Sequence, residues 1–211
     1  MQRIALLFDA EFATINFEKA QLMKHALISL LVLLSACNGG ELKTGSSEPS
    51  ENLYDYDVEE RIESLGITLS EPGKPVANYV NAVRSGDLVF MAGKGPGASA
   101  ETMIKGKIPS DLSVEEGYEA ARLCAIEQLS ALKSEIGDLN RVVRIVKVFG
   151  MVNADPSFTA HSQVINGFSD LMVEVFGERG KHARAAVGMG SLPLNMACEI
   201  EMIVEVKDDL D

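Results

Sequence analysis

The sequence lacks tryptophan, and aromatic residues make up only 6% of its 211 positions. It also lacks a surplus of basic residues, because the formal net charge is −12. Nucleic-acid-binding proteins use clustered Lys and Arg to contact phosphates, and many stack bases on aromatic rings. The composition therefore argues against a nucleic-acid partner. The acidic surplus is explained by solubility.

Cysteine and histidine are scarce as well. The three cysteines, Cys37, Cys124 and Cys198, and the three scattered histidines show no spacing typical of a zinc site, so we expect no metal. Cys124 falls in a helical pattern and Cys198 in a strand pattern, which favours two buried thiols. A disulfide between them is the alternative in an oxidising compartment.

An apolar run long enough to span a bilayer is missing, but a shorter one stands near the N-terminus. It covers residues 26–34 and follows Lys24. The next residues complete the motif Leu34-Ser35-Ala36-Cys37, which resembles a bacterial lipobox. We therefore predict a lipoprotein signal peptide at 23–36, with a lipid attached to Cys37. A buried core helix is the alternative interpretation of this run.

Residues 1–22 carry three acidic side chains, which is unusual at the start of a signal peptide. We interpret this segment as a misassigned extension and Met23 as the true start. Residues 37–55 are polar and rich in Gly, Ser and Glu, which predicts a flexible tether. Asn38 after the lipobox indicates the outer membrane. The protein is thus expected in the periplasm on a lipid anchor, or in the cytoplasm if Met1 is the start.

Residues 56–211 carry the patterns of one α+β domain. Periodicity and capping residues predict helices at 58–65, 113–136 and 155–177, and strands at 76–83, 88–92, 139–152, 182–190 and 197–206. In the last strand, apolar residues alternate with Glu199, Glu201 and Glu205. The two long helices can cover only one face of such a sheet. The other face is expected to pack against further subunits.

Seven short motifs follow one another along these elements: Asn78-Tyr79-Val80, Phe90-Met91-Ala92-Gly93-Lys94-Gly95-Pro96, Gly106-Lys107-Ile108-Pro109, Val164-Ile165-Asn166, Ala183-Arg184-Ala185, Leu192-Pro193 and Glu199-Ile200-Glu201. In this order they resemble the YjgF/RidA family, which has the chorismate-mutase-like fold. The resemblance covers most of the domain, from residue 75 to 206. It implies a mixed sheet with two helices on one face, and a homotrimer with clefts between its subunits.

The resemblance also implies an activity. Active members of the family hydrolyse reactive enamines and imines, such as 2-aminoacrylate, to a keto acid and ammonia without a cofactor. By this resemblance Arg184 would bind the substrate carboxylate, and Glu199 would hold or activate the attacking water. The alternatives are an interface salt bridge for Arg184 and a solvated strand face for Glu199.

Four further residues would line the site by resemblance. They are Tyr79, Gly93, Lys94 and Asn166. Each also has a purely structural interpretation: a packed core tyrosine, a flexible turn, a solvated loop lysine and a helix-surface amide, respectively.

Three positions depart from the family pattern. Ala92 stands where active members have Ser, Lys94 replaces Gln, and Ala186 replaces a Cys. These changes remove groups that could orient water or substrate. A non-catalytic trimer that binds a carboxylate or another metabolite at the cell envelope is therefore the alternative function. Ribonuclease activity, a label given to parts of the family, is disfavoured by the charge and by the lack of a His pair.

Overall fold

The computed structural model describes residues 53–75 and 77–207. The segments interpreted above as extension, signal peptide and most of the tether, together with Cys37, lie outside the described residues. Three helices and five strands make up the domain: α2 (Val58–Ser64), β1 (Ala82–Ser85), β2 (Leu88–Met91), α3 (Val114–Ile136), β3 (Val142–Asn153), α4 (His161–Phe176), β4 (Ala183–Met189) and β5 (Cys198–Val206). Short 3-10 turns flank β3 and β4.

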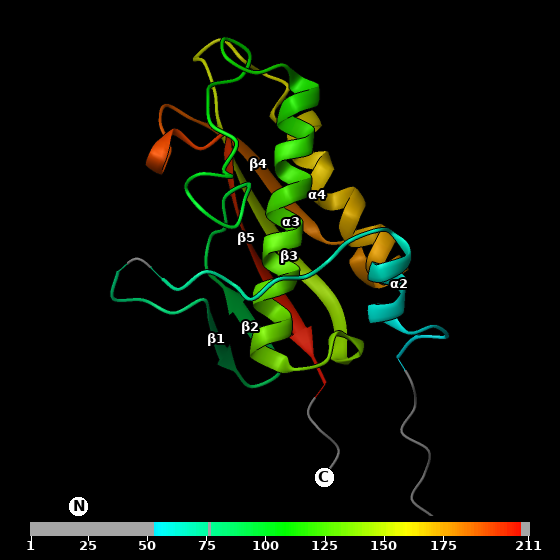
Figure 1. Cartoon of the computed structure of the whole chain (residues 1–211). Coiled ribbons are helices and arrows are strands. Elements are labelled where there is room, and N and C mark those ends of the chain that lie inside the picture. Colours follow the sequence, from blue (N-terminus) through cyan, green and yellow to red (C-terminus); the bar gives the residue numbers. More distant parts are fainter. Residues whose placement is uncertain (1–52, 76, 208–211) are drawn as a thin grey trace, which may run out of the picture. The chain divides into compact units, whose positions relative to one another are not determined.

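The five strands form one mixed sheet in the order β1-β2-β5-β3-β4. Strands β3 and β4 run parallel, joined by the α4 crossover, and the other neighbours are antiparallel. Helices α3 and α4 lie side by side over one face of this sheet (Figure 1). The expected α+β fold, with two long helices on one face, is confirmed.

Helix α3 begins and ends where its sequence signals stand. The Ser113 hydroxyl accepts from the Glu116 amide, and the Glu116 carboxylate accepts from the Ser113 amide, which completes the predicted capping box. Gly137 ends the helix with a φ of 82°, a conformation that favours glycine. These two local signals place a long helix across the sheet.

Three predicted boundaries are wrong. The strand predicted to start at residue 139 starts at Val142, because Leu139–Arg141 form a 3-10 turn that Asp138 caps. Strand β1 starts at Ala82 and not at residue 76, because the preceding residues form bends and have no ladder partner among the described residues. Helix α4 starts at His161 and not at 155. The Phe158 amide donates to the Asp155 carbonyl (2.9 Å), which closes a separate turn at Pro156 before the helix begins.

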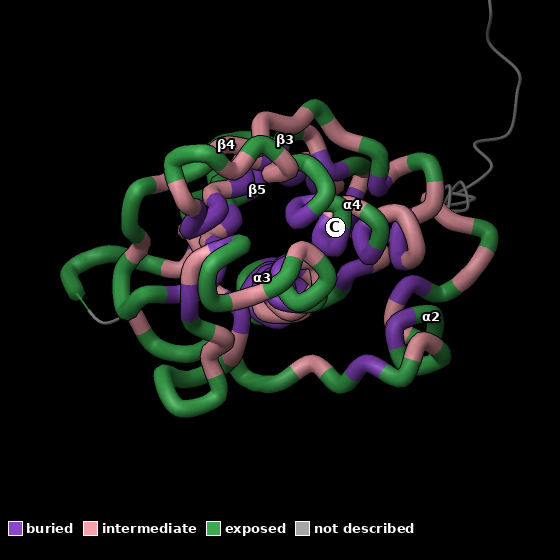
Figure 2. The backbone as a smooth tube through the Cα atoms, turned by 90° about the horizontal axis from the view of Figure 1, so that it is seen from above, coloured by how far each residue is buried: buried purple, intermediate pink, exposed green. Residues whose placement is uncertain are grey.

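The core lies between the sheet and the two long helices, as the buried segments in Figure 2 show. The alternation predicted for β5 is confirmed, because Cys198, Ile200, Met202, Val204 and Val206 are all buried. Gly167 allows α3 and α4 to pack closely. A side chain at this position would overlap the Tyr118 carbonyl oxygen.

The opposite face of the sheet is open in the single chain. Val83 and Phe90 are 55% and 42% exposed there, and Phe149, Met151 and Ile203 are only half-buried. A face that mixes exposed apolar residues with carboxylates is typical of a surface that meets a partner.

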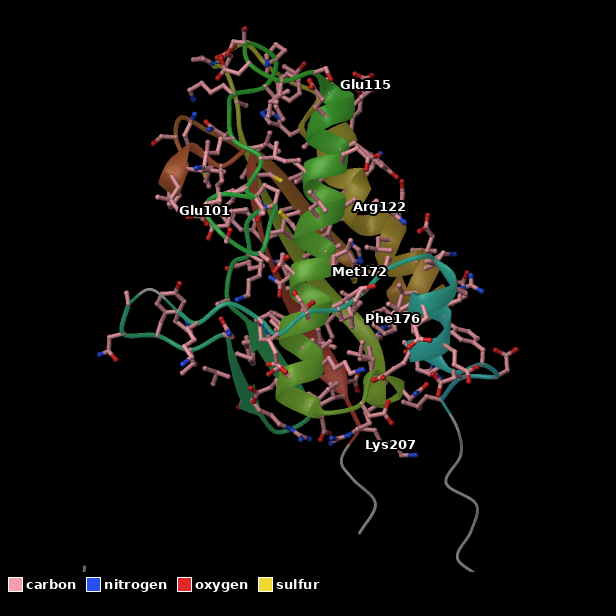
Figure 3. The ribbon with its side chains drawn as sticks, viewed as in Figure 1. Glu101, Glu115, Arg122, Met172, Phe176 and Lys207 are labelled. Atoms are coloured by element: carbon pink, nitrogen blue, oxygen red, sulfur yellow. The ribbon has the colours of Figure 1, made fainter. Side chains whose placement is uncertain are left out.

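The N-terminal end of the described chain packs on α4. Arg179 donates to the carbonyl oxygens of Leu53 (3.0 Å) and Val143 (2.9 Å), and the Tyr56 hydroxyl donates to Val175. Arg122 lies on the side of α3 that faces α4 (Figure 3). Its guanidinium pairs with the Glu174 carboxylate of α4 at 2.9 Å. The Arg122–Glu174 pair links α4 to α3, and α4 in turn carries part of the candidate site.

Candidate functional site

Arg184 lies on the edge strand β4 with its side chain on the helix side of the sheet. Its parallel partner in β3 is the buried Val148. Arg184 Nη1 donates to Asn166 Oδ1 (3.0 Å) and to Ser169 Oγ (2.9 Å), and Nη2 lies 3.5 Å from the Ser162 carbonyl oxygen. All three acceptors belong to α4. The structure thus brings together two predicted site residues, Arg184 and Asn166.

Every one of these acceptors is neutral. Within the part of the chain that the structure describes, Arg184 has no carboxylate partner. Among the described residues Arg184 makes no ion pair with a glutamate of its own last strand, and the alternative of an interface salt bridge concerns a second copy of the chain. A guanidinium that is oriented by neutral groups keeps its full charge, and its Nε–H and Nη2–H groups can donate to the two oxygens of a carboxylate.

A histidine and a serine that the sequence analysis did not assign complete the surroundings of Arg184. Ser169 Oγ lies 3.0 Å from His182 Nε2, and His182 Nδ1 lies 2.7 Å from the Gly180 carbonyl oxygen. We refer to Arg184, Asn166, Ser169 and His182 as the Arg184 cluster. The spacing in the sequence is the one signal that could have identified His182: it stands two residues before Arg184, and side chains two residues apart share one side of a strand.

Glu199 lies on β5 and faces the open side of the sheet. Gly93 passes so close to it that a Cβ on this glycine would overlap Glu199 Oε1. Burial raises the pKa of Glu199, and the nearby Glu201 raises it further. A carboxyl group whose pKa is shifted toward neutrality is better suited to exchange protons with a substrate or water. Glu199 and Gly93 are therefore a second pair of predicted site residues that the fold brings together.

Lys94 follows Gly93 but points away from Glu199. Its main chain pairs with Ile200 through two 3.0 Å hydrogen bonds, and its Nζ donates to Asn81 Oδ1 at 2.6 Å. Burial lowers the pKa of Lys94, and Glu127 of α3 partly opposes this effect. The structure thus places the predicted ligand contact Lys94 on the helix side, next to Asn81 and Glu127.

Gln128 holds this loop in place from within α3. The side chain is fully buried, and its Nε2 donates to the carbonyl oxygens of Ala92 (2.9 Å) and Ile200 (2.6 Å). These carbonyls flank the point where Gly93 approaches Glu199. No sequence pattern indicates this role, since Gln128 stands within the apolar stripe of the helix.

Tyr79 precedes β1, and half of its surface (51%) is exposed. The packed core tyrosine considered as an alternative is therefore excluded. Strand β1 and the Arg184 strand β4 are the two edges of the sheet, about 19 Å apart at the usual spacing of 4.8 Å between strands. Within one chain, Tyr79 and Arg184 do not meet.

A hollow of ≈ 810 Å³ lies at the start of α3. It is lined by Ile104, Leu112, Val114, Glu115, Glu116, Tyr118, Glu119 and Gln163. None of the predicted site residues lines it. Arg184 and Glu199 therefore do not face this hollow, and it is not the site that they would form.

In residues 53–75 and 77–207, no His, Cys, Asp and Glu side chains gather in a group of three or more that could hold a metal ion. Among the same residues, none of the helices has the length and apolar character needed to cross a membrane.

Comparison with known proteins places the chain in a family. The model of the family described as "YjgF/chorismate_mutase-like, putative endoribonuclease" matches residues 59–206. Protein TCP17 of Trypanosoma cruzi is 41% identical over 152 residues, which cover 72% of this chain and 95% of that protein. The chain belongs to the YjgF/RidA family.

Solved structures agree with this assignment. The protein Atu1372 of Agrobacterium tumefaciens, of unknown function, is 41% identical with a TM-score of 0.66, covering 71% of this chain and 92% of that one. A "putative endoribonuclease" from Shewanella oneidensis MR-1 is 30% identical with a TM-score of 0.69, covering 72% and 100%. The resemblance to the YjgF/RidA family and its chorismate-mutase-like fold is confirmed.

Proposed function

We propose that this protein binds a small carboxylate at Arg184 and hydrolyses enamines or imines of the 2-aminoacrylate type to a keto acid and ammonia. The observation that carries the proposal is the state of Arg184. Its guanidinium is oriented by Asn166 and Ser169, yet it has no carboxylate partner among the described residues. A half-buried cation held in this way favours an anionic ligand.

The reaction needs few groups. An enamine first transfers one N–H proton to its β-carbon and becomes the imine. Water then adds to the carbon of the C=N bond, both protons of the water end on the nitrogen, and the C–N bond breaks to leave a keto acid and ammonia. Arg184 would fix the substrate by its carboxylate. Glu199, with its raised pKa, would take a proton from water and return it to nitrogen. The chemistry requires no cofactor.

Because Arg184 and Glu199 lie on opposite faces of the sheet, the site would be shared between copies of the chain. A homotrimer, as the family resemblance implies, would bring Arg184 of one copy near Glu199 and Tyr79 of the next. The exposed apolar face around Val83 and Phe90 supports such an assembly. For the complete chain, we propose the envelope location described above, with a lipid on Cys37.

The second candidate function is carboxylate binding without catalysis. It is favoured by Ala92 and Ala186, whose methyl groups stand where the family pattern has a hydroxyl and a thiol. Arg184 would serve both functions equally, so the two differ only in the chemical step.

Keto-acid release from an imino acid generated in place by an amino acid oxidase tests the proposal. We expect the wild-type protein to accelerate release, Arg184→Ala to abolish the acceleration, and Lys105→Ala, which removes an exposed cation, to leave it unchanged. Binding of pyruvate that depends on Arg184, without acceleration, would favour the second function. If Arg184→Ala matches the wild type in both assays, both functions are wrong.

A further inference from the structure

The hydrogen bonds of the Arg184 cluster form a chain with a fixed direction. The Gly180 carbonyl can only accept, so His182 Nδ1 carries a hydrogen and donates to it at 2.7 Å. In the neutral ring, His182 Nε2 is therefore an acceptor, and the Ser169 hydroxyl donates to it at 3.0 Å. Ser169 Oγ then accepts from Arg184 Nη1 at 2.9 Å. His182 thus fixes the hydroxyl that orients the guanidinium.

We propose that His182 is a positioning residue that acts on Arg184 through Ser169, and that capture of an anion by Arg184 draws a proton onto His182. This inference rests on the proposed carboxylate site and adds its coupling to pH. Neither Ser169 nor His182 belongs to the residues that the family resemblance assigned to the site.

The charges around His182 support the coupling. Burial lowers the pKa of His182 most; Arg184 lowers it further, while the hydrogen bond to Gly180 opposes both. From α4, the ring meets the neutral Ser169 and the edge of Phe168. The positive charge that bears on the imidazole is thus that of Arg184 itself.

Other charged groups on the surrounding elements have partners or face elsewhere. Lys181, the residue before His182, is exposed and paired with Glu178 of the preceding turn at 2.6 Å. Asp170, which follows Ser169 on α4, accepts from the Tyr118 hydroxyl. Lys147 of β3 is exposed on the open face of the sheet. The dominant electrostatic neighbour of His182 remains the guanidinium.

An anion bound to Arg184 would cancel this repulsion. The pKa of His182 then rises, and the imidazole takes up one proton from solvent. The new Nε2–H donates to Ser169 Oγ, which accepts from Arg184 as well because an oxygen has two lone pairs. The serine hydrogen is released to turn toward the ligand. Linkage is reciprocal, so a ligand that raises the pKa of His182 must bind more tightly as the pH falls.

The direct test follows the His182 ring by NMR during a pH titration of the full chain. We expect a midpoint below the usual value in the free protein, a rise on saturation with pyruvate, and a rise in Arg184→Gln without any ligand. The comparison of the wild type with Arg184→Gln does not depend on ligand binding. If the midpoint of His182 stays the same in Arg184→Gln, the coupling is overturned.

Pyruvate affinity between pH 7.5 and 5.5 provides the second measurement, since pyruvate stays ionised in this range. We expect the wild type to bind roughly fivefold or more tightly at the lower pH, as is common for coupled sites. His182→Gln keeps an acceptor for Ser169 but cannot titrate, so its affinity should not change with pH. His161→Gln, a histidine at the start of α4 outside the cluster, should behave like the wild type.

The outcomes separate this inference from the proposed function. If Arg184→Gln abolishes pyruvate binding but His182→Gln keeps the wild-type pH dependence, the carboxylate site stands and the role of His182 is wrong; Glu199 would then be the group that titrates. If pyruvate fails to bind at any pH, the proposed function loses its support. The ligand-free comparison of Arg184→Gln still decides the coupling.

Discussion

The side chains of Arg184 and Glu199 lie on opposite faces of the sheet, and strand β3 separates the strands that carry them. Arg184 is held by α4 on the covered face, and Glu199 meets Gly93 on the open face. One chain cannot present both groups to one small molecule. A ligand site that uses both therefore requires contact between copies, and this requirement can be tested.

The first prediction concerns the assembly. Phe90→Glu places a charge on the open apolar face, where the native side chain is 42% exposed, and we expect it to convert a trimer into monomers. Light scattering during size-exclusion chromatography measures the change. Keto-acid release should be lost together with the trimer, although Arg184 is unchanged. Ser64→Glu, on the exposed end of α2, is the control. A wild-type protein that runs as a monomer contradicts the shared site.

The second prediction concerns the contact between Gly93 and Glu199. In Gly93→Ala the new methyl group overlaps the Glu199 carboxylate, and the flexible end of that side chain must move aside. Stability should fall by about 1 kcal/mol. The rate of keto-acid release should fall on the order of tenfold or more, because a small displacement of a catalytic group is costly.

Gly190→Ala provides the matched control for this substitution. A Cβ on Gly190 would meet nothing within 4 Å, and the residue lies outside the left-handed region. It should leave both stability and rate unchanged. An unchanged rate in Gly93→Ala, with normal folding, would remove Glu199 from the reaction.

Much of the fold could be predicted because its signals are local. The capping box at Ser113, the glycine at 137 and the alternation along β5 each depend on neighbours in sequence, and each is confirmed. The Arg184 cluster could be predicted only in part. Ser169 and His182 meet because α4 crosses back over the parallel pair β3 and β4, and no local pattern records this contact.

Gln128 was missed for a different reason. A glutamine between apolar residues of a helix has the same pattern whether its amide is buried and bonded or simply at the surface. Only its position opposite the Ala92 and Ile200 carbonyls gives it a function.

The early start predicted for β1 failed because the apolar run at 76–83 contains residues that bend and remain exposed.

The third prediction concerns Gln128. Gln128→Leu removes the donor from two carbonyl oxygens, which costs about 1–3 kcal/mol. Part of this loss is offset, because Gln128 Oε1 is itself buried with no partner among the described residues. Urea unfolding should therefore show a net loss of about 1–2 kcal/mol. Gln163→Leu, at an exposed site on α4, should change stability little. Equal stability of the two variants would show that Gln128 does not hold the loop.

The last prediction concerns the buried thiols. Cys124 Sγ and Cys198 Sγ lie 3.5 Å apart, both residues are fully buried, and both are free thiols, as the sequence interpretation favoured. Burial raises the pKa of the Cys124 thiol, and its contact with Cys198 adds to the effect. In the unfolded chain this thiol ionises near pH 8.5, whereas the folded protein keeps it protonated. Its contribution to stability is therefore complete below this pH and declines as the pH rises.

Urea unfolding under reducing conditions at pH 7.5 and 9.5 measures this decline. The wild type should lose about 1 kcal/mol more between the two pH values than Cys124→Ala, because only the wild type has the thiol to ionise on unfolding. The variant is less stable at both pH values, but the difference between them is what matters. If the free energy of unfolding falls equally in the wild type and in Cys124→Ala between the two pH values, the pKa of the Cys124 thiol is not raised in the folded protein.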